Sequence, residues 1–330
     1  MDSITDHGTA PDGKPFQGIA IGGPELTARV LTFGAALQDL RLTGHAPPLV
    51  LGYADPTGYF NNPHKLGAVV GRCANRIADG RFTLDGQTHA LDRNDGGVQT
   101  LHGGADGVQN KSWTLLDHGP AHVSLGLQLP DGHMGFPGAL DMRCTYRVEG
   151  TALEIELQGE TDAPTYCNLT NHSYFTVTGD ATTEGHRLRI DAEDVLDLGN
   201  QMIPTGRTTP VSGTALDFRS PAAPSVPLDH NFCLAEARRD LTRAAVLEAA
   251  GLSMTLSTTE PGLQVYDGRA LDKTGQIGLN GAPYGPHAGI ALEPQAWPDA
   301  PNQPWAHQAL LRPGETYRHL TRLAFSRAPA

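Results

Sequence analysis

Residues 142–159 read MRCTYRVEGTALEIELQG. Two runs in this stretch, MRCTYRVEG and LEIELQG, alternate apolar with polar side chains, and a Glu-Gly turn separates them. Alternation with a period of two places the apolar side chains on one face of a β-strand. Two such runs joined by a short turn that contains glycine favour an antiparallel hairpin. The stretch therefore predicts two neighbouring strands with one buried face.

Short apolar runs of this kind recur along the chain, for example GIAIGG, RFTLDGQTHAL, HVSLGLQLP and HRLRIDAEDV. The 39 glycines and 25 prolines are spread between them and supply many turns. Ten or more candidate strands with short polar loops indicate an all-β antiparallel sandwich or barrel with few short helices. Because no repeat, low-complexity tract or long linker divides the 330 residues, we expect one domain over residues 1–330.

One segment allows two interpretations. AEARRDLTRAAVLEAAG (235–251) is rich in Ala, Leu, Glu and Arg, which favours a helix. Together with the following LSMTLSTTEP, it can equally form a strand, RAAVLEA (243–249), that turns at Gly251 into a second strand.

The charge and the cysteines restrict the possible partners and compartment. The chain has 24 Lys and Arg against 36 Asp and Glu, a net charge of −12, which argues against nucleic acid and anionic membranes as partners. No stretch approaches the roughly 18 consecutive apolar residues of a membrane span. The four cysteines show no CxxC spacing, and the N-terminus has no apolar signal core. These features predict a soluble, cytoplasmic protein with free thiols.

A histidine inside a polar strand candidate is the first chemical signal. TYCNLTNHSYFTVTG (165–179) has the β-branched and aromatic residues of a strand. If that strand is regular, Asn168, Thr170, His172 and Tyr174 share one face. This face is too polar for an ordinary core. A hydrogen-bonded buried His172 and a solvated sheet face are the alternatives to a functional site.

Two segments in the first third of the chain carry further candidates. His102 precedes two glycines in TLHGGADG (100–107), where the glycines allow close backbone approach to a ligand but also suit a simple turn. Asn75 and Arg76 lie between apolar residues in GRCANRIADG (71–80), where Arg76 can also serve as the partner of a structural carboxylate.

Three candidates lie in the last third. Asp229 stands in the Pro-bounded loop PLDHNF, and Gln264 alternates with apolar residues in PGLQVY. The alternatives to a functional role are a turn cap for Asp229 and the solvated face of a strand for Gln264. Glu293 ends the apolar run GIAL and precedes Pro294. A carboxyl group at the end of a buried strand has a raised pKa because burial disfavours its charge, which suits a general base near neutral pH.

Taken together and in order, these segments resemble the aldose 1-epimerase (galactose mutarotase) family. The matching segments, spread from about residue 20 to residue 326, are GRCANRIADGRFTLDG, TLHGG, DGHMGFPG, NLTNHSYF, IPTG, LDHNF, TTEPGLQVY, ALEPQAWPDAPNQP and LRPGETY. The resemblance implies a large antiparallel β-supersandwich with an open cleft. It also implies that residues 243–258 form a hairpin rather than a helix.

The resemblance further implies interconversion of the α and β anomers of a free aldose, such as galactose or glucose, without metal or cofactor. We expect a monosaccharide as the partner and a monomer or homodimer as the oligomeric state. Glu293 corresponds to the general base, His172 to the general acid, and His102 to a residue that hydrogen-bonds the reacting region. The residues that correspond to sugar-orienting positions are Asn75, Arg76, Asp229 and Gln264.

Two other functions are alternatives within this resemblance. A hexose-6-phosphate 1-epimerase would need additional basic residues, which the composition does not favour. A non-catalytic sugar-binding or regulatory homologue would have lost the acid or the base, whereas both are present. Two departures from the family pattern, at Thr100 and at His133–Met134, are expected to affect which sugar fits rather than the acid–base pair.

Overall fold

Strands β12 (Leu140–Glu149) and β13 (Ala152–Thr161) form the hairpin that the stretch 142–159 predicts. The computed structural model describes residues 3–271 and 275–327. In β13 the side chains of Leu153, Ile155 and Leu157 are buried, and those between them are half-buried on the other face. Local alternation therefore fixes which face of this hairpin enters the core.

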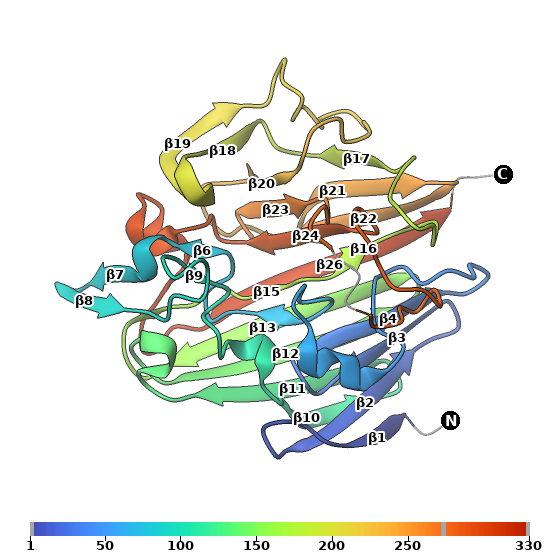
Figure 1. Cartoon of the computed structure of the whole chain (residues 1–330), viewed down its shortest axis with the longest axis horizontal. Coiled ribbons are helices and arrows are strands. Elements are labelled where there is room, and N and C mark those ends of the chain that lie inside the picture. Colours follow the sequence, from blue (N-terminus) through green and yellow to red (C-terminus); the bar gives the residue numbers. More distant parts are fainter. Residues whose placement is uncertain (1–2, 272–274, 328–330) are drawn as a thin grey trace.

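Three large sheets contain most of the strand residues (Figure 1). The eight-stranded sheet has the order β10 (Thr114–Gly119), β11 (His122–Leu129), β12, β13, β26 (Tyr317–Arg327), β22 (Leu252–Thr258), β21 (Thr242–Ala249) and β17 (Arg187–Ile190). The six-stranded sheet has the order β16 (Tyr174–Phe175), β24 (Ile290–Gln295), β23 (Gly262–Tyr266), β20 (Asp229–Cys233), β18 (Asp194–Leu198) and β19 (Pro204–Pro210). The four-stranded sheet contains β1 (Ile4–Thr9), β2 (Pro15–Gly22), β3 (Leu26–Leu31) and β4 (Ala36–Leu42).

Shorter elements connect these sheets. The two-stranded pairs are β5 (Val69–Val70) with β15 (Thr170–Asn171), β6 (Arg76–Ile77) with β9 (Thr100–Leu101), β7 (Arg81–Leu84) with β8 (Gln87–Ala90), and β14 (Thr165–Tyr166) with β25 (Leu310–Leu311). The helices of the described residues are single 3-10 turns or little more: η1 (Pro56–Asn61), η2 (Ala78–Gly80), η3 (Val108–Asn110), η4 (His133–Gly135), η5 (Asn200–Met202), η6 (Ala300–Asn302) and η7 (Ala306–Gln308). The predicted all-β antiparallel class with few short helices is confirmed.

One large apolar core joins the three large sheets. Its members include Val30 of the four-stranded sheet, Leu125 of the eight-stranded sheet and Leu292 of the six-stranded sheet. Side chains alternate along a strand, so the neighbours of Leu292 and of Val265 on β23 point away from this core. The outer face of the six-stranded sheet is therefore available for polar residues.

The ambiguous segment 235–251 contains a strand and no helix. β21 and β22 pair as an antiparallel hairpin, with Ala249 opposite Leu252. The two turn residues, Ala250 and Gly251, have φ angles of 48° and 76°. Pairing of β22 with β26 on its other side outweighs the local helix propensity. The hairpin that the family resemblance implies is confirmed.

Two further observations concern the helices and the thiols. Within the described ranges, no helix is long and apolar enough to cross a membrane. All four cysteines, Cys73, Cys144, Cys167 and Cys233, are free thiols, as the absence of CxxC spacing predicts.

Candidate active site

Glu293 lies inside β24, on the face of the six-stranded sheet that points away from the main core. Its neighbours Leu292 and Ile290 enter the core, so alternation turns Glu293 to the other face. The strand continues through Pro294, opposite Leu263, to Gln295. The expectation that the strand ends at Glu293 is therefore wrong: a proline lacks only the N–H donor, and the strand continues past it.

The segment around His172 is not the regular strand that its composition suggests. β14, β15 and β16 are separate two-residue pieces, and each pairs with a different partner, β25, β5 and β24 respectively. His172 lies between β15 and β16. Its N–H donates to the carbonyl of Ala68 (2.8 Å), and its own carbonyl accepts from the N–H of Gly67 (3.1 Å). The main chain on both sides of the imidazole is thereby fixed.

The polar neighbours of His172 are buried and mostly hydrogen-bonded. The side-chain amide of Asn171 donates to the carbonyl of Gly67 (2.7 Å) and to the hydroxyl of Tyr146 (3.1 Å). Its Oδ1 atom accepts from the hydroxyl of Ser173 (2.6 Å). The ring of Tyr174 lies 5.1 Å from the ring of His172. These residues hold the histidine in place, as expected of a supporting shell.

His102 is held by the main chain of Asn75. The N–H of Asn75 donates to Nδ1 of His102 (3.2 Å), and the N–H of His102 donates to the carbonyl of Asn75 (3.0 Å). A neutral imidazole whose Nδ1 accepts a hydrogen bond carries its proton on Nε2. His102 therefore presents an N–H donor on its free side. Both residues have left-handed backbones, with φ of 60° for Asn75 and 50° for His102.

The glycine after His102 serves the fold. A Cβ atom on Gly103 would lie 2.0 Å from the carbonyl oxygen of Gly71, and the φ of Gly103 is 80°. The close approach that the His-Gly-Gly motif allows is therefore made to another part of the chain. It brings the loop of His102 against the segment that leads to Asn75.

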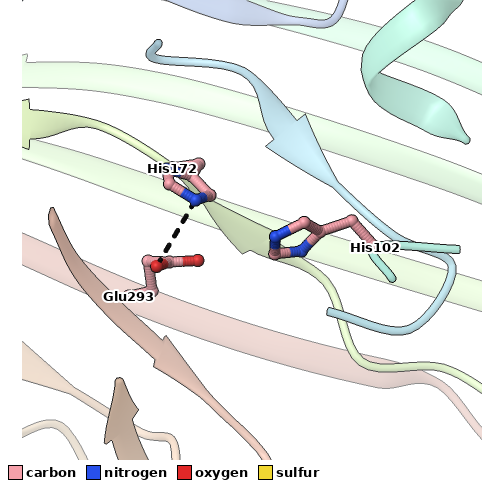
Figure 2. A group of neighbouring side chains, drawn as sticks. All are labelled: His102, His172 and Glu293. Atoms are coloured by element: carbon pink, nitrogen blue, oxygen red, sulfur yellow. Dashed lines mark ion pairs between the residues drawn. The ribbon is translucent and has the colours of Figure 1, made fainter. Parts of the chain in front are cut away.

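Figure 2 shows His102, His172 and Glu293 gathered from three different segments. Nε2 of His172 lies 3.5 Å from Oε1 of Glu293, and the two imidazole rings lie 5.3 Å apart at 76°. His102 is 9% exposed, His172 is 6% exposed and Glu293 is 2% exposed. Oε2 of Glu293 is buried and has no hydrogen-bond partner among the described residues. A ligand that donates a hydrogen bond can satisfy this acceptor.

Burial shifts the protonation of the two central groups in opposite directions. It lowers the pKa of His172 to about 4 and, with help from the charge of Asp229, raises the pKa of Glu293 well above its ordinary value. Both shifts disfavour charge, so a neutral imidazole and a protonated carboxyl are favoured over an ion pair. Burial and the neighbouring His172 also lower the pKa of His102, which stays a neutral donor.

The three side chains also have the residue types of a metal site. One ligand atom from each lies within 4.8 Å of the others. However, the lone pair on Nδ1 of His102 accepts from Asn75, and Nε2 carries the proton. This tautomer leaves only His172 and Glu293 as ligands, fewer than the three protein ligands typical of a catalytic zinc site.

A group of polar residues lies beside Glu293 on the same sheet face. Gln264 on β23 is directly opposite Glu293, and its amide donates to Oδ1 of Asp229 on β20 (2.7 Å). Burial raises the pKa of Asp229, while the positive charge of Arg76 opposes this shift. The structure thus brings together all seven residues that the resemblance indicates, with Asn75 acting through the main chain that holds His102.

Three comparisons relate this chain to known proteins. The model of the aldose 1-epimerase family matches residues 18–324. Galactose mutarotase from Mus musculus is 40% identical over 344 residues, covering 98% of each chain, and aldose 1-epimerase from Escherichia coli is 33% identical, covering 96% of this chain and 97% of its own. The crystal structure of galactose 1-epimerase from Lactobacillus acidophilus superposes with a TM-score of 0.86 at 26% identity, covering 99% of this chain and 98% of that one.

This chain belongs to the aldose 1-epimerase family. The predicted family is confirmed, and with it the predicted isomerase class and the mutarotase-like supersandwich.

Arg76 of this aldose 1-epimerase is paired with a carboxylate, as the structural alternative for this residue predicted. Its Nε atom donates to Oδ2 of Asp95 (2.8 Å), and both side chains are partly exposed, at 20% and 33%. The ion pair leaves the other guanidinium nitrogens of Arg76 to reach a ligand. The ion pair confirms the structural alternative, and the sugar-orienting role of Arg76 stays a prediction.

The two departures from the family pattern lie in different environments. Thr100 is buried in β9, and its hydroxyl donates to the carbonyl of Asp92 (2.6 Å). His133 lies in η4 with Nε2 3.2 Å from Oδ2 of Asp106, and Met134 packs beside Gly104. Their expected effect on sugar choice stays a prediction.

Two residues near this epimerase site were not predicted from the sequence. Asn231 lies opposite Gln264, and its buried Oδ1 atom has no partner among the described residues. Alternation from Asp229 in DHNF would have indicated it, because both share a strand face. Arg269 approaches Oδ2 of Asp229 to 3.8 Å and helps line a neighbouring cavity of about 580 Å³. It follows a turn after β23, where no local pattern indicates its direction.

Proposed function

We propose that this aldose 1-epimerase acts on a free monosaccharide, with Glu293 as the general base and His172 as the general acid. The observation that carries this proposal is the buried pair itself: Nε2 of His172 lies 3.5 Å from Oε1 of Glu293, and Oε2 of Glu293 has no partner in the described chain. A sugar hydroxyl supplies the donor that this oxygen lacks.

The reaction needs one proton removed and one proton added. Glu293 takes the proton of the C1 hydroxyl, the C1–O5 bond breaks, and His172 gives a proton to O5, which becomes the C5 hydroxyl. Rotation about the C1–C2 bond then presents the other face of the aldehyde, and the two residues exchange roles on closure. Each proton transfer contributes roughly 10²–10⁴-fold to the rate.

The protonation states that burial favours for Glu293 and His172 are compatible with these roles. A protonated Glu293 beside a neutral His172 holds the same number of protons as a carboxylate beside an imidazolium. Transfer of one proton across the 3.5 Å separation converts the first form into the second. Hydrogen bonds from the C1 hydroxyl to the carboxylate and from the imidazolium to O5 stabilise the charged form once sugar is bound.

The remaining residues bind and orient the sugar in this proposal. The Nε2–H of His102 donates to an oxygen of the reacting region, a role that its tautomer supports. Asp229 accepts hydrogen bonds from sugar hydroxyls, with Gln264 and Arg76 beside it.

A neutral sugar also suits the charges at the site. Arg76 is paired with Asp95, and Arg269 lies near Asp229 and Asp267, so both cations already have carboxylate partners. A hexose 6-phosphate would have to compete with these carboxylates for its cation contacts. This pairing favours the free aldose over the phosphorylated one.

A polarimetric panel tests the proposal. Freshly dissolved α-glucose, α-galactose, L-arabinose and xylose should each be followed with and without the protein, together with glucose 6-phosphate. We expect at least one free sugar to equilibrate faster with the protein, and glucose 6-phosphate to respond less. A panel in which no sugar is accelerated would identify a non-catalytic homologue. The cytoplasmic location, the single domain over residues 1–330 and the monomer or homodimer stay predictions.

A further inference from the structure

The segment that carries His172 separates from β24 at the point where the acid and the base face each other. β16 pairs with β24 through Tyr174 opposite Ala291 and Phe175 opposite Ile290. Continued in the same register, this pairing would place His172 directly opposite Glu293. Instead, the residues before His172 form β15 and pair with β5, so the ladder with β24 stops at Tyr174.

Beyond the point where the β16–β24 ladder stops, Asn168 joins the His172 segment to the end of β24 again. The N–H of Ala296 donates to Oδ1 of Asn168 (2.9 Å), and Nδ2 of Asn168 approaches the carbonyl of Ala296 at 3.4 Å. A side-chain amide carries one donor and one acceptor group in the arrangement of a peptide unit. Asn168, which is 3% exposed, therefore replaces the main-chain pairing that β24 would otherwise make there.

The main chain of Asn168 also holds the segment that positions His102. Its N–H donates to the carbonyl of Arg72 (2.8 Å), and its carbonyl accepts from the N–H of Ala74 (2.7 Å). Ala74 directly precedes Asn75, whose N–H donates to Nδ1 of His102. Asn168, four residues before His172, is thus bonded both to the chain that follows Glu293 and to the segment that holds His102.

Pro294 increases the importance of this contact. It follows Glu293 directly and has no N–H to donate to a neighbouring strand. The next anchors beyond it are Gln295, opposite Gly262, and Ala296, bonded to Asn168. On the side facing His172, the gap is held by the β16–β24 pairing at one end and by Asn168 at the other.

We propose that Asn168 is a positioning residue of the acid–base pair: its side-chain amide fixes β24 relative to the His172 segment and so sets the separation of His172 and Glu293. The inference rests on the proposed function of these two residues. Asn168 touches no reacting atom and acts through the strands that it joins. A displacement of about 1 Å at a reacting group can reduce a rate by roughly 10²-fold.

The test compares Asn168→Ala and Asn168→Asp with the wild type in the polarimetric assay. Asn168→Ala removes both contacts to Ala296. We expect its kcat to fall by roughly 10²-fold while KM changes by less than about threefold, because the sugar-binding residues are untouched. Gln38→Ala is the matched control. Gln38 lies on β4, and its buried side-chain amide donates to the carbonyl of Tyr53 (2.9 Å). This variant should lower the melting temperature and leave kcat unchanged.

Asn168→Asp adds a readout that a purely structural role would not move. A protonated carboxyl group reproduces the donor and the acceptor of the amide, whereas an ionised one repels the carbonyl of Ala296. The ratio of its kcat to that of the wild type should therefore rise as the pH is lowered. This variant also carries the test if Asn168→Ala does not fold.

The outcomes separate this inference from the function on which it rests. An Asn168→Ala protein with wild-type kcat, or an Asn168→Asp protein whose pH profile parallels that of the wild type, overturns the positioning role. Full activity of Glu293→Gln would overturn the proposed acid–base roles instead. Loss of activity in Glu293→Gln together with pH-dependent rescue in Asn168→Asp supports both.

Discussion

Nε2 of His172 lies 3.5 Å from Oε1 of Glu293, in a site where burial disfavours the charge of both groups. This separation is longer than a good N–H···O hydrogen bond, so neither group satisfies the other fully. The pair therefore has the capacity to bind one more donor and one more acceptor. A pyranose ring offers both, at its C1 hydroxyl and its ring oxygen.

Replacing Glu293 by Gln should reduce kcat by roughly 10²–10⁴-fold, because an amide has similar shape but cannot take the C1 proton. Polarimetry with the preferred sugar measures the effect, and KM should change little by comparison. Glu184→Gln is a suitable control, since Glu184 is an exposed glutamate in the loop before β17. A Glu293→Gln protein that keeps its full rate would contradict the assignment of the base.

The buried His172 should make the folded protein sensitive to acid. In the unfolded chain a histidine takes up its proton near pH 6.5, whereas in the folded chain the pKa of His172 is about 4. Between these values the unfolded state binds the extra proton, so the free energy of unfolding falls as the pH is lowered from 6.5 to about 4. The loss attributable to this residue is on the order of 3 kcal/mol.

Urea unfolding of the wild type and of His172→Asn at pH 7 and near pH 4 measures this contribution. The raised pKa of Glu293 acts in the opposite direction, but Glu293 and the other buried histidines titrate in both proteins and cancel in the comparison. The wild type should lose more stability than the variant over this interval. Equal losses would mean that His172 titrates alike in the folded and unfolded chains.

Asp229→Ala should raise KM by roughly tenfold or more and change kcat less, because a hydrogen bond to a charged group contributes about 1.5–3 kcal/mol. The steady-state parameters of the preferred sugar provide the measurement. Asp197→Ala is the matched control: Asp197 lies on β18 and pairs at the surface with Arg207. If kcat falls and KM does not, Asp229 acts in the transition state rather than in binding.

The sequence alone predicts much of this fold because alternation is a local property. The β12–β13 hairpin and the inward direction of Leu153 follow directly from it. The division of residues 165–175 into three short strands does not, because their partners lie at residues 310–311, 69–70 and 290–291. Such pairing depends on the register of distant segments, which no local pattern contains.

The candidate site shows the same division between local and distant information. Residue types and the order of the segments single out Glu293, His172 and His102 as candidate site residues. The contact that fixes the tautomer of His102, however, comes from the main chain of Asn75. The pairing of Arg76 with Asp95 likewise depends on the β6–β9 pairing, which brings the loop before β9 to Arg76. Chemistry-bearing residues can therefore be found in the sequence, whereas their supporting contacts require the structure.

An ion pair between Arg238, whose side chain is 28% exposed, and the fully buried Glu260 gives the last prediction. Arg238 donates to both carboxylate oxygens of Glu260, at 2.7 and 3.3 Å, and the Glu260 side chain is fully buried. The guanidinium lies 4.5 Å from the ring centre of Tyr317, whose hydroxyl donates to the carbonyl of Leu169 (3.1 Å) and accepts from its N–H (3.1 Å). The pair thus supports the chain three residues before His172.

Arg238→Met should lower the free energy of unfolding by about 3–5 kcal/mol, because it leaves the buried carboxylate of Glu260 without a partner. Urea unfolding at pH 7 measures the loss, and the surface variant Arg207→Met should change stability by less than about 1 kcal/mol. Adding Glu260→Leu to Arg238→Met removes the unpaired charge and should recover much of the lost stability. A double variant no more stable than Arg238→Met would show that the cost comes from lost packing on Tyr317 rather than from the unpaired carboxylate.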